Sequence, residues 1–324
     1  MPYDRSAFVT RTADEKVAFD FMVEADAYIA DKLFSPKPVD KAEKKIFQYD
    51  LSKLRRINTK AATNAKAPLT GEQLFTSNLT LDEYKLGAEI NPRNVRDADN
   101  ANLINETRLV KVVTNHLLLD RELIAATLAT TVGNYPAALT SALAAGSRWN
   151  DAAGDPEADK VVVDNAMRSS CGMKANAVAM DESTWLKLKT SPSFRSRIQY
   201  TNAGPVSLEH VKAFFGVDFV FISTARYNTA LEGAADAISS VWSDNVLFFY
   251  HNPGVALDDV GYGMMGIIDS PFKVTVREDM TRVGTAGPMR VVEVATEYGL
   301  KAGFVKASGD GDFAAGYLLR TAVT

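Results

Sequence analysis

Hydrophobic positions follow their most regular pattern between Asp97 and Thr131, a stretch without proline or glycine. At 100° per residue, Lys111, Asn115 and Glu122 fall on one half of a helix and the large aliphatic residues fall on the other half. The aliphatic set is Leu109, Val112, Val113, Leu117, Leu119, Leu123, Ile124 and Leu128. The pattern predicts one amphipathic helix of roughly 30 residues and about 45 Å, whereas a typical helix has about 11 residues. We expect this helix to be a spine against which other elements pack.

The patterning before the spine is weaker. Residues 13–33 have a helical spacing that the prolines of the next segment interrupt. Residues 36–66 are polar and rich in lysine, which predicts an extended arm that a neighbouring chain orders; a flexible terminus without a role is the alternative. We therefore expect that a truncation of residues 1–35 leaves a soluble, folded subunit that no longer assembles normally with other copies.

The stretch 67–96 alternates more clearly between apolar and polar residues, and it predicts a two-stranded ribbon with its turn at Thr70-Gly71. Neither strand is apolar enough for a buried sheet. Because an isolated two-stranded ribbon is only marginally stable in water, we expect this ribbon to lie against another chain.

Alternating helix and strand signals after the spine predict a compact α/β unit. Asp181 and Ser191 stand at N-cap positions, Pro192 at a first helical position, and Gly216 where a helix ends. The expected helices cover 158–169, 181–188, 191–200 and 207–215, and the expected strands cover 177–180, 217–223 and 237–250. The chain then becomes β-rich, with strands expected at 272–278, 289–305 and 313–323. We expect the last strand to cover the spine helix, so that the spine domain is discontinuous in sequence.

Composition narrows the class of protein. The chain has 324 residues, of which 46% are hydrophobic, so it can bury a sizeable core. A net charge of −4 argues against a protein whose main task is to bind nucleic acid. The single cysteine, Cys171, excludes an internal disulfide framework and fits a reducing compartment. We find neither an apolar run long enough for a membrane span nor the basic start and apolar core of a signal peptide.

Gly261–Gly266 matches the fingerprint of dinucleotide-binding proteins, which requires a strand before the glycines and a helix after them. Strand-like residues and a proline follow here instead. We interpret the segment as a loop or bulge that needs glycine, and a cofactor site is the alternative.

Other candidates for chemistry are also weak. His116 and Asp120 stand four apart on the predicted apolar face, in line with Thr127, and no nucleophile elbow accompanies them. We interpret them as a hydrogen-bonded pair inside the fold or at a subunit contact. The other residues that could bind a metal ion do not form a site. His210, His251 and Cys171 are scattered along the sequence, and Asp310 and Asp312 lie in a turn that is too short for a calcium-binding loop. The aromatic residues Trp149, Trp242, Phe248, Phe249 and Tyr250 are more typical of a core or interface than of a ligand pocket. The sequence predicts no catalytic residue, cofactor or metal ligand.

The order of these elements resembles the major capsid proteins of tailed bacteriophages, which have the Hong-Kong-97-type fold. The most specific similarity lies in 147–159, where Arg148-Trp149-Asn150-Asp151 and Asp155-Pro156 resemble the family's RWDD…SDP loop. Further similar motifs are Met180-Asp181, Trp185, Ile198-Gln199-Tyr200, Gly204-Pro205-Val206, Phe215-Gly216-Val217 and the run from Ala225 to Gly233. The resemblance covers most of the chain.

The resemblance implies an α+β fold with four parts. An N-terminal arm would cover 1–60 and an extended β-hairpin loop 61–96. A peripheral domain with the spine helix would combine 97–147 and 270–324, and an axial domain would cover 148–269.

The resemblance also implies a structural, non-enzymatic function. The chain would self-assemble as hexamers and pentamers into an icosahedral head shell, first as a procapsid, in the cytoplasm of the host bacterium. In the virion this shell would enclose double-stranded DNA, which it contacts weakly. The expected partners are other copies of the chain, a portal protein, possible decoration proteins and, since only about 60 residues precede the ribbon, a separate scaffolding protein. Some members of the family join their subunits by an isopeptide bond between a lysine and an asparagine. Lys60, Lys66 and Lys85 lie in or near the ribbon, but we can match neither the partner asparagine nor the catalytic glutamate in this sequence, so we expect no such cross-link.

Two alternatives stay open. An encapsulin-like nanocompartment would use the same fold around an enzyme cargo, although the long arm and the Trp149 loop favour the phage interpretation. An α/β oxidoreductase would instead use a nucleotide cofactor at Gly261–Gly266. Neighbouring genes test the first alternative, and binding of a nicotinamide cofactor tests the second.

Overall fold

The computed structural model describes residues 9–10, 27–49, 56, 59–60, 66, 74–92, 106–198, 206–231, 233–254, 261–268, 272–284, 287–302 and 313–323. Its helices are α2 (Ala30–Leu33), α4 (Glu106–Thr130), α5 (Pro156–Cys171), α6 (Glu182–Thr190), α7 (Pro192–Ile198) and α8 (Leu208–Phe215), with 3-10 turns at Val132–Asn134 and Ala137–Leu139. Its strands are β1 (Val9–Thr10), β2 (Ser35–Pro38), β3 (Glu43–Tyr49), β4 (Leu74–Thr80), β5 (Asp82–Ile90), β6 (Thr140–Ala142), β7 (Ala177–Asp181), β8 (Phe219–Ser223), β9 (Arg226–Asn228), β10 (Ile238–Ser240), β11 (Val246–Phe249), β12 (Gly263–Ile267), β13 (Lys273–Gly284), β14 (Gly287–Ala302) and β15 (Gly316–Arg320). The fold is α+β, as the sequence predicts.

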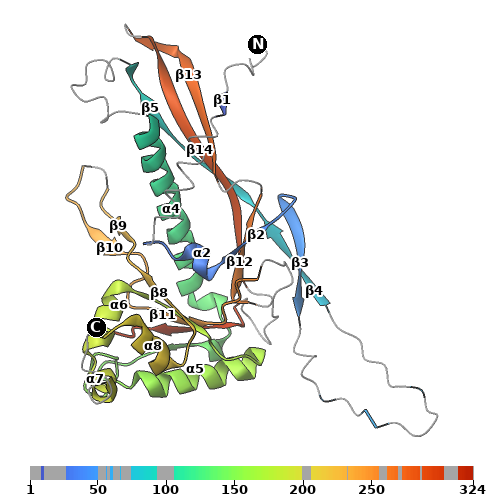
Figure 1. Cartoon of the computed structure of the whole chain (residues 1–324), viewed down its shortest axis with the longest axis vertical. Coiled ribbons are helices and arrows are strands. Elements are labelled where there is room, and N and C mark those ends of the chain that lie inside the picture. The colour runs from blue at the N-terminus through green and yellow to red at the C-terminus, as the bar shows by residue number, and fades with distance from the viewer. Residues whose placement is uncertain are drawn as a thin grey trace.

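The spine helix α4 lies along a long, twisted sheet (Figure 1). Strand β14 forms the axis of this sheet and pairs antiparallel with β13, β5 and β12. β1 extends the sheet beyond β13, and β2 adds a parallel strand beside β12. Alternate residues of β13 and β14 pack against the helix in one cluster, whose members include Val110, Val113, Leu117, Leu118, Val274, Val276, Val292 and Val294.

The extent of the spine helix is predicted better than its buried face. The helix ends at Thr130, close to the predicted end, while residues 97–105 of the prediction lie outside the described residues. Val112, expected on the apolar side, is 43% exposed, whereas Glu122, expected on the polar side, is fully buried. The helix therefore has two buried sides, because the sheet covers part of it and a second unit covers another part.

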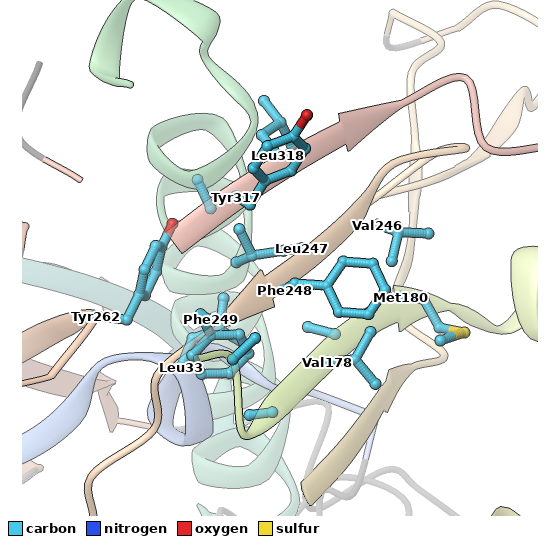
Figure 2. Packing of buried hydrophobic residues seen from close by; sticks show 14 of the residues in the cluster. Leu33, Val178, Met180, Val246, Leu247, Phe248, Phe249, Tyr262, Tyr317 and Leu318 are labelled. Atoms are coloured by element: carbon cyan, nitrogen blue, oxygen red, sulfur yellow. The ribbon is translucent and has the colours of Figure 1, made fainter. Parts of the chain in front are cut away.

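The second unit is the predicted α/β unit, built on a sheet with the order β6-β15-β11-β7-β8. β11 pairs antiparallel with both β7 and β15, so that Phe249 lies opposite Ala177 on one side and Gly316 on the other. β8 and β6 are the parallel edge strands. Figure 2 shows apolar side chains from β7, β11 and β15 gathered with Leu33 and Tyr262 from outside the unit in one core.

The C-terminal strand corrects the predicted division of the chain. The sequence places 313–323 over the spine helix, but β15 pairs with β11 and β6 inside the α/β unit. β12, expected in the axial domain, instead belongs to the sheet of the spine. The partners of β15 could not be deduced from the sequence, because strand alternation does not specify which sheet a strand enters.

Local signals in the α/β unit are confirmed. The Asp181 carboxylate caps α6 by accepting a hydrogen bond from Ser183 N at 2.9 Å, and Pro192 opens α7. Gly216 ends α8 in the left-handed conformation, with φ of 60°. The predicted strand 237–250 is two strands, β10 and β11, because the chain turns at Ser243 with φ of 52°.

The ribbon also differs from the prediction. β4 pairs antiparallel with β3, which lies in the stretch assigned to the arm, while β5 pairs with β14 of the same chain. The predicted turn at Thr70-Gly71 lies outside the described residues. Ile46 and Leu79 anchor the ribbon against Met264 of β12. The ribbon therefore has partners within its own chain.

Residues just before β2 belong to the core rather than to a free arm. Ile29, Leu33 and Phe34 are buried in the core of the α/β unit. The structure therefore argues against the expectation that residues 1–35 can be removed without loss of the fold, because the cut removes these side chains.

Candidate functional site: projecting elements and the buried junction

Three elements project from the body of the molecule in Figure 1: the long sheet with α4, the β3–β4 ribbon and the β9–β10 hairpin. Two of them carry large apolar side chains in solvent. Leu231 and Ile238 of the hairpin segment are 84% and 69% exposed, and Met280 of β13 is 71% exposed. Apolar side chains at the ends of projecting elements add nothing to the core of this chain, so they are candidates for contacts with other molecules.

A buried carboxylate joins the segments from which these elements extend. Glu122 of α4 accepts hydrogen bonds from the backbone N–H groups of Ile29 and Ala30, at 3.0 and 2.7 Å. Trp242 Nε1 donates to the other carboxylate oxygen at 2.7 Å, and Ser223 Oγ donates to the same oxygen at 3.3 Å. One side chain of the spine thus binds the N-terminal segment and the α/β unit.

Burial has the larger effect on the pKa of the Glu122 carboxyl, which lies above its usual value. Burial raises the pKa of Glu122, and the bonds from Trp242, Ala30 and Ile29 oppose that rise. The neighbouring Arg121 forms an ion pair with Asp31 of α2, with Nη2 and Oδ2 2.9 Å apart. Helical periodicity could not identify this junction, because its hydrogen-bond donors lie about 90 or more residues away in sequence.

The loop that carries the capsid-like motif is a second structural junction. Trp149 is fully buried, and its Nε1 donates to Asp159 Oδ2 at 2.8 Å. Asp155 caps α5 by accepting from Glu157 N at 3.1 Å. A Cβ at Gly154 would lie 2.1 Å from Arg148 O, so only glycine fits there. These residues fix the entry of the chain into the α/β unit.

The glycines of 261–266 lie in and beside a strand, not in a loop or bulge as predicted. Four of the six residues belong to β12, so the turn and helix that a dinucleotide site needs are not formed by them. Close packing explains two of the glycines. A Cβ at Gly263 would lie 2.6 Å from the Phe34 ring, and a Cβ at Gly266 would lie 2.7 Å from Leu79.

His116, Asp120 and Thr127 lie on the exposed side of α4 rather than on its apolar face. The interpretation of His116 and Asp120 as a pair inside the fold is therefore wrong, and a role at a subunit contact stays a prediction. His210 binds Ser207 at the start of α8. Asp310 and Asp312 lie outside the described residues.

His251 and Cys171 occupy apolar surroundings. The His251 ring contacts Phe219, Phe221 and Phe249, with ring centroids 5.0, 5.4 and 6.1 Å away, and burial lowers its pKa. Burial raises the pKa of the Cys171 thiol. As predicted, the aromatic residues pack in the core: Trp149, Trp242, Phe248 and Phe249 are buried.

Within the described ranges, no group of three or more histidine, cysteine, aspartate or glutamate side chains could hold a metal ion. Likewise, none of the described helices has the length and apolar character of a membrane span. Of the three lysines near the ribbon, Lys85 is paired with Glu83 at 2.9 Å.

Comparison with solved structures defines the class of fold. The chain superimposes on a phage-related protein from Bordetella bronchiseptica RB50 with a TM-score of 0.72, 22% identity and 98% of each chain covered. A chain from the capsid of cyanophage P-SCSP1u gives a TM-score of 0.57 and 12% identity over 91% of this chain and 88% of that chain. The fold is that of the Hong-Kong-97-type capsid proteins of tailed phages.

Comparison in sequence leads to a particular relative. The chain is 26% identical, over 226 residues, to the major capsid protein of Burkholderia phage BcepMu, which covers 69% of this chain and 71% of that protein. No protein-family model matches the chain. The resemblance to tailed-phage major capsid proteins is confirmed by both comparisons.

Proposed function

We propose that this chain is the structural subunit of a phage head, which assembles as hexamers and pentamers into an icosahedral shell around double-stranded DNA. The observation that carries the proposal is the fold match over nearly the whole chain to a protein in a phage capsid. The sequence relationship to a phage major capsid protein supports the same role.

The physical features of the chain fit a shell subunit. A shell needs heterologous contacts, in which each subunit uses a different surface from its neighbour, and such contacts close into rings by symmetry. Projecting ribbons add contact area of this kind without enlarging the hydrophobic core of the subunit. The three projecting elements, two of which carry exposed apolar side chains, match this requirement. A net charge of −4 suits a shell that surrounds DNA without binding it tightly, since affinity for DNA comes mainly from lysine and arginine.

The proposal assigns roles to parts of the chain. The N-terminal arm and the β3–β4 ribbon reach neighbouring subunits, the spine unit forms the periphery, and the α/β unit points to the centre of each capsomer. A separate scaffolding protein, a portal protein and decoration proteins are the proposed partners, and the mature location is the virion. No catalytic role is proposed.

Negative-stain electron microscopy of the expressed chain, with and without its neighbouring gene product, tests the proposal. Closed or broken shells tens of nanometres across are the expected result. Small, discrete oligomers under every condition would contradict it. Dependence of shells on the neighbouring product would identify the scaffolding protein.

A further inference from the structure

The α/β unit carries two exposed apolar surfaces on opposite sides. Figure 1 shows the β9–β10 hairpin rising from the upper side of the unit, while α5 lies along the lower side. The hairpin surface, here called the tip, consists of residues 229–231 and 233–238. The helix surface, here called the α5 stripe, consists of Ala158, Val161, Val162, Asn165, Arg168 and Ser169, all of which are exposed.

The described part of the chain leaves the α5 stripe exposed. The residues of the stripe are separated by 3, 1, 3, 3 and 1 positions, which places them on one face of the helix, opposite the buried Val163 and Met167. Val161 and Val162 are 56% and 57% exposed. Valine at a solvent-facing helix position lowers the helix propensity and gains no free energy from burial within its own chain. We therefore expect another surface to cover these two valines.

The tip is apolar and internally fixed. The Asn228 side chain accepts hydrogen bonds from Ala230 N and Ala237 N, each at 3.0 Å, and donates one to Asp236 at 2.8 Å. Thr229 N also bonds to Ala237 O at 2.8 Å. These bonds hold the tip in one conformation, with Leu231 in solvent. A preorganised apolar tip loses little conformational entropy when it binds.

The two surfaces complement each other in charge as well as polarity. The tip carries the exposed carboxylate of Asp236 beside its apolar residues, and the α5 stripe carries the guanidinium of Arg168 beside its valines. Charges of opposite sign at the rim of an apolar contact fix its register and speed association. Two tips facing each other, or two stripes, would instead bring like charges together.

We propose that the tip of one copy packs on the α5 stripe of a second copy. The surfaces lie on opposite sides of the unit, so the contact is head-to-tail, and repetition of such a contact generates a ring when the rotation closes. The inference rests on the proposed assembly function and names the two faces that meet between neighbouring α/β units. Leu231 and Ile238 supply the apolar contact with Val161 and Val162.

Cross-linking between introduced cysteines tests the contact in the assembled protein. Leu231→Cys and Val162→Cys are made separately and together, and treated with a short bismaleimide. Native Cys171 is a buried thiol with a raised pKa, so it reacts poorly. The double variant should give a ladder of covalent multimers on a denaturing gel. A mixture of the two single variants should give dimers only.

Each other outcome has a definite meaning. A covalent dimer from either single variant alone would show a like-with-like contact and overturn the head-to-tail arrangement. Shells without any cross-link would overturn the contact and leave the proposed function intact. Failure of the unmodified chain to assemble at all would instead reject the proposed function.

Substitutions give an independent readout that does not depend on cysteine chemistry. Val162→Asp should abolish assembly while the unassembled subunit keeps its unfolding transition, and Leu186→Asp on α6, an equally exposed leucine, is the matched control. Arg168→Glu should slow assembly, and Arg168→Lys should restore it because the charge returns. Normal assembly of Val162→Asp, or equal losses in both aspartate variants, would refute the proposed contact.

Discussion

The buried carboxylate of Glu122 provides the sharpest test of how this fold is held together. Glu122→Gln keeps the size of the side chain but replaces one oxygen with an NH2 group. Glu122 accepts four hydrogen bonds, two on each oxygen, so the amide can satisfy only one pair of donors. The other pair then faces N–H groups of the amide, which donate rather than accept.

The expected loss follows from these contacts. A hydrogen bond to a charged group contributes about 1.5–3 kcal/mol, and a buried donor without an acceptor costs a similar amount. With two donors left without an acceptor, Glu122→Gln should lower the free energy of unfolding by ~3–6 kcal/mol. This is a large part of the roughly 5–15 kcal/mol that stabilises a typical domain.

Urea denaturation of the unassembled subunit, followed by tryptophan fluorescence, measures this loss. Trp242 donates directly to Glu122, so its emission also reports on the junction. The control is Glu209→Gln, which removes an exposed partner of Lys212 and should change stability by less than about 0.5 kcal/mol. Hydrogen exchange at the donors that lose their acceptor, either the amides of Ile29 and Ala30 or the indole N–H of Trp242, should become faster only in Glu122→Gln. Equal stability of the two variants would refute the reasoning.

Three further predictions follow from the described contacts. Burial lowers the pKa of His251 from 6.5, so protonation of its ring favours the unfolded state. The free energy of unfolding should therefore fall as the pH drops below 6.5, by at most ~1.4 kcal/mol per pH unit. His251→Phe should reduce this slope in urea titrations from about pH 7 to about pH 5, and an unchanged slope would contradict the assignment. Trp149→Phe should lower the free energy of unfolding by about 1–3 kcal/mol in thermal unfolding, because Asp159 loses its hydrogen-bond donor. If the loss has this origin, adding Asp159→Asn to the Trp149→Phe variant should cause no further loss, and a further loss would argue against it. Gly299→Ala should prevent soluble expression or strongly lower the melting temperature, because its Cβ would lie 2.0 Å from Thr80 O; a normal melting temperature would show that β4 and β14 can separate freely.

The sequence by itself determined the elements whose signals are local. The long helical period defines α4 and its end near Thr130, and cap chemistry places Asp181 and Gly216 at helix ends. Short motifs around Trp149 identify the class of capsid fold that the comparisons confirm. These features are readable because a helix turn or a cap involves residues only a few positions apart.

Only the tertiary structure decided which segments meet. Alternation predicts that 313–323 contains a strand, but β15 joins β11 and β6 because those strands offer both backbone partners and a matching apolar face. The buried state of Glu122 likewise depends on donors from Ile29 and Trp242, which no helical pattern contains. Periodicity gives the direction of side chains within one element, whereas the choice of sheet, partner and buried polar contact depends on packing between segments far apart in the chain.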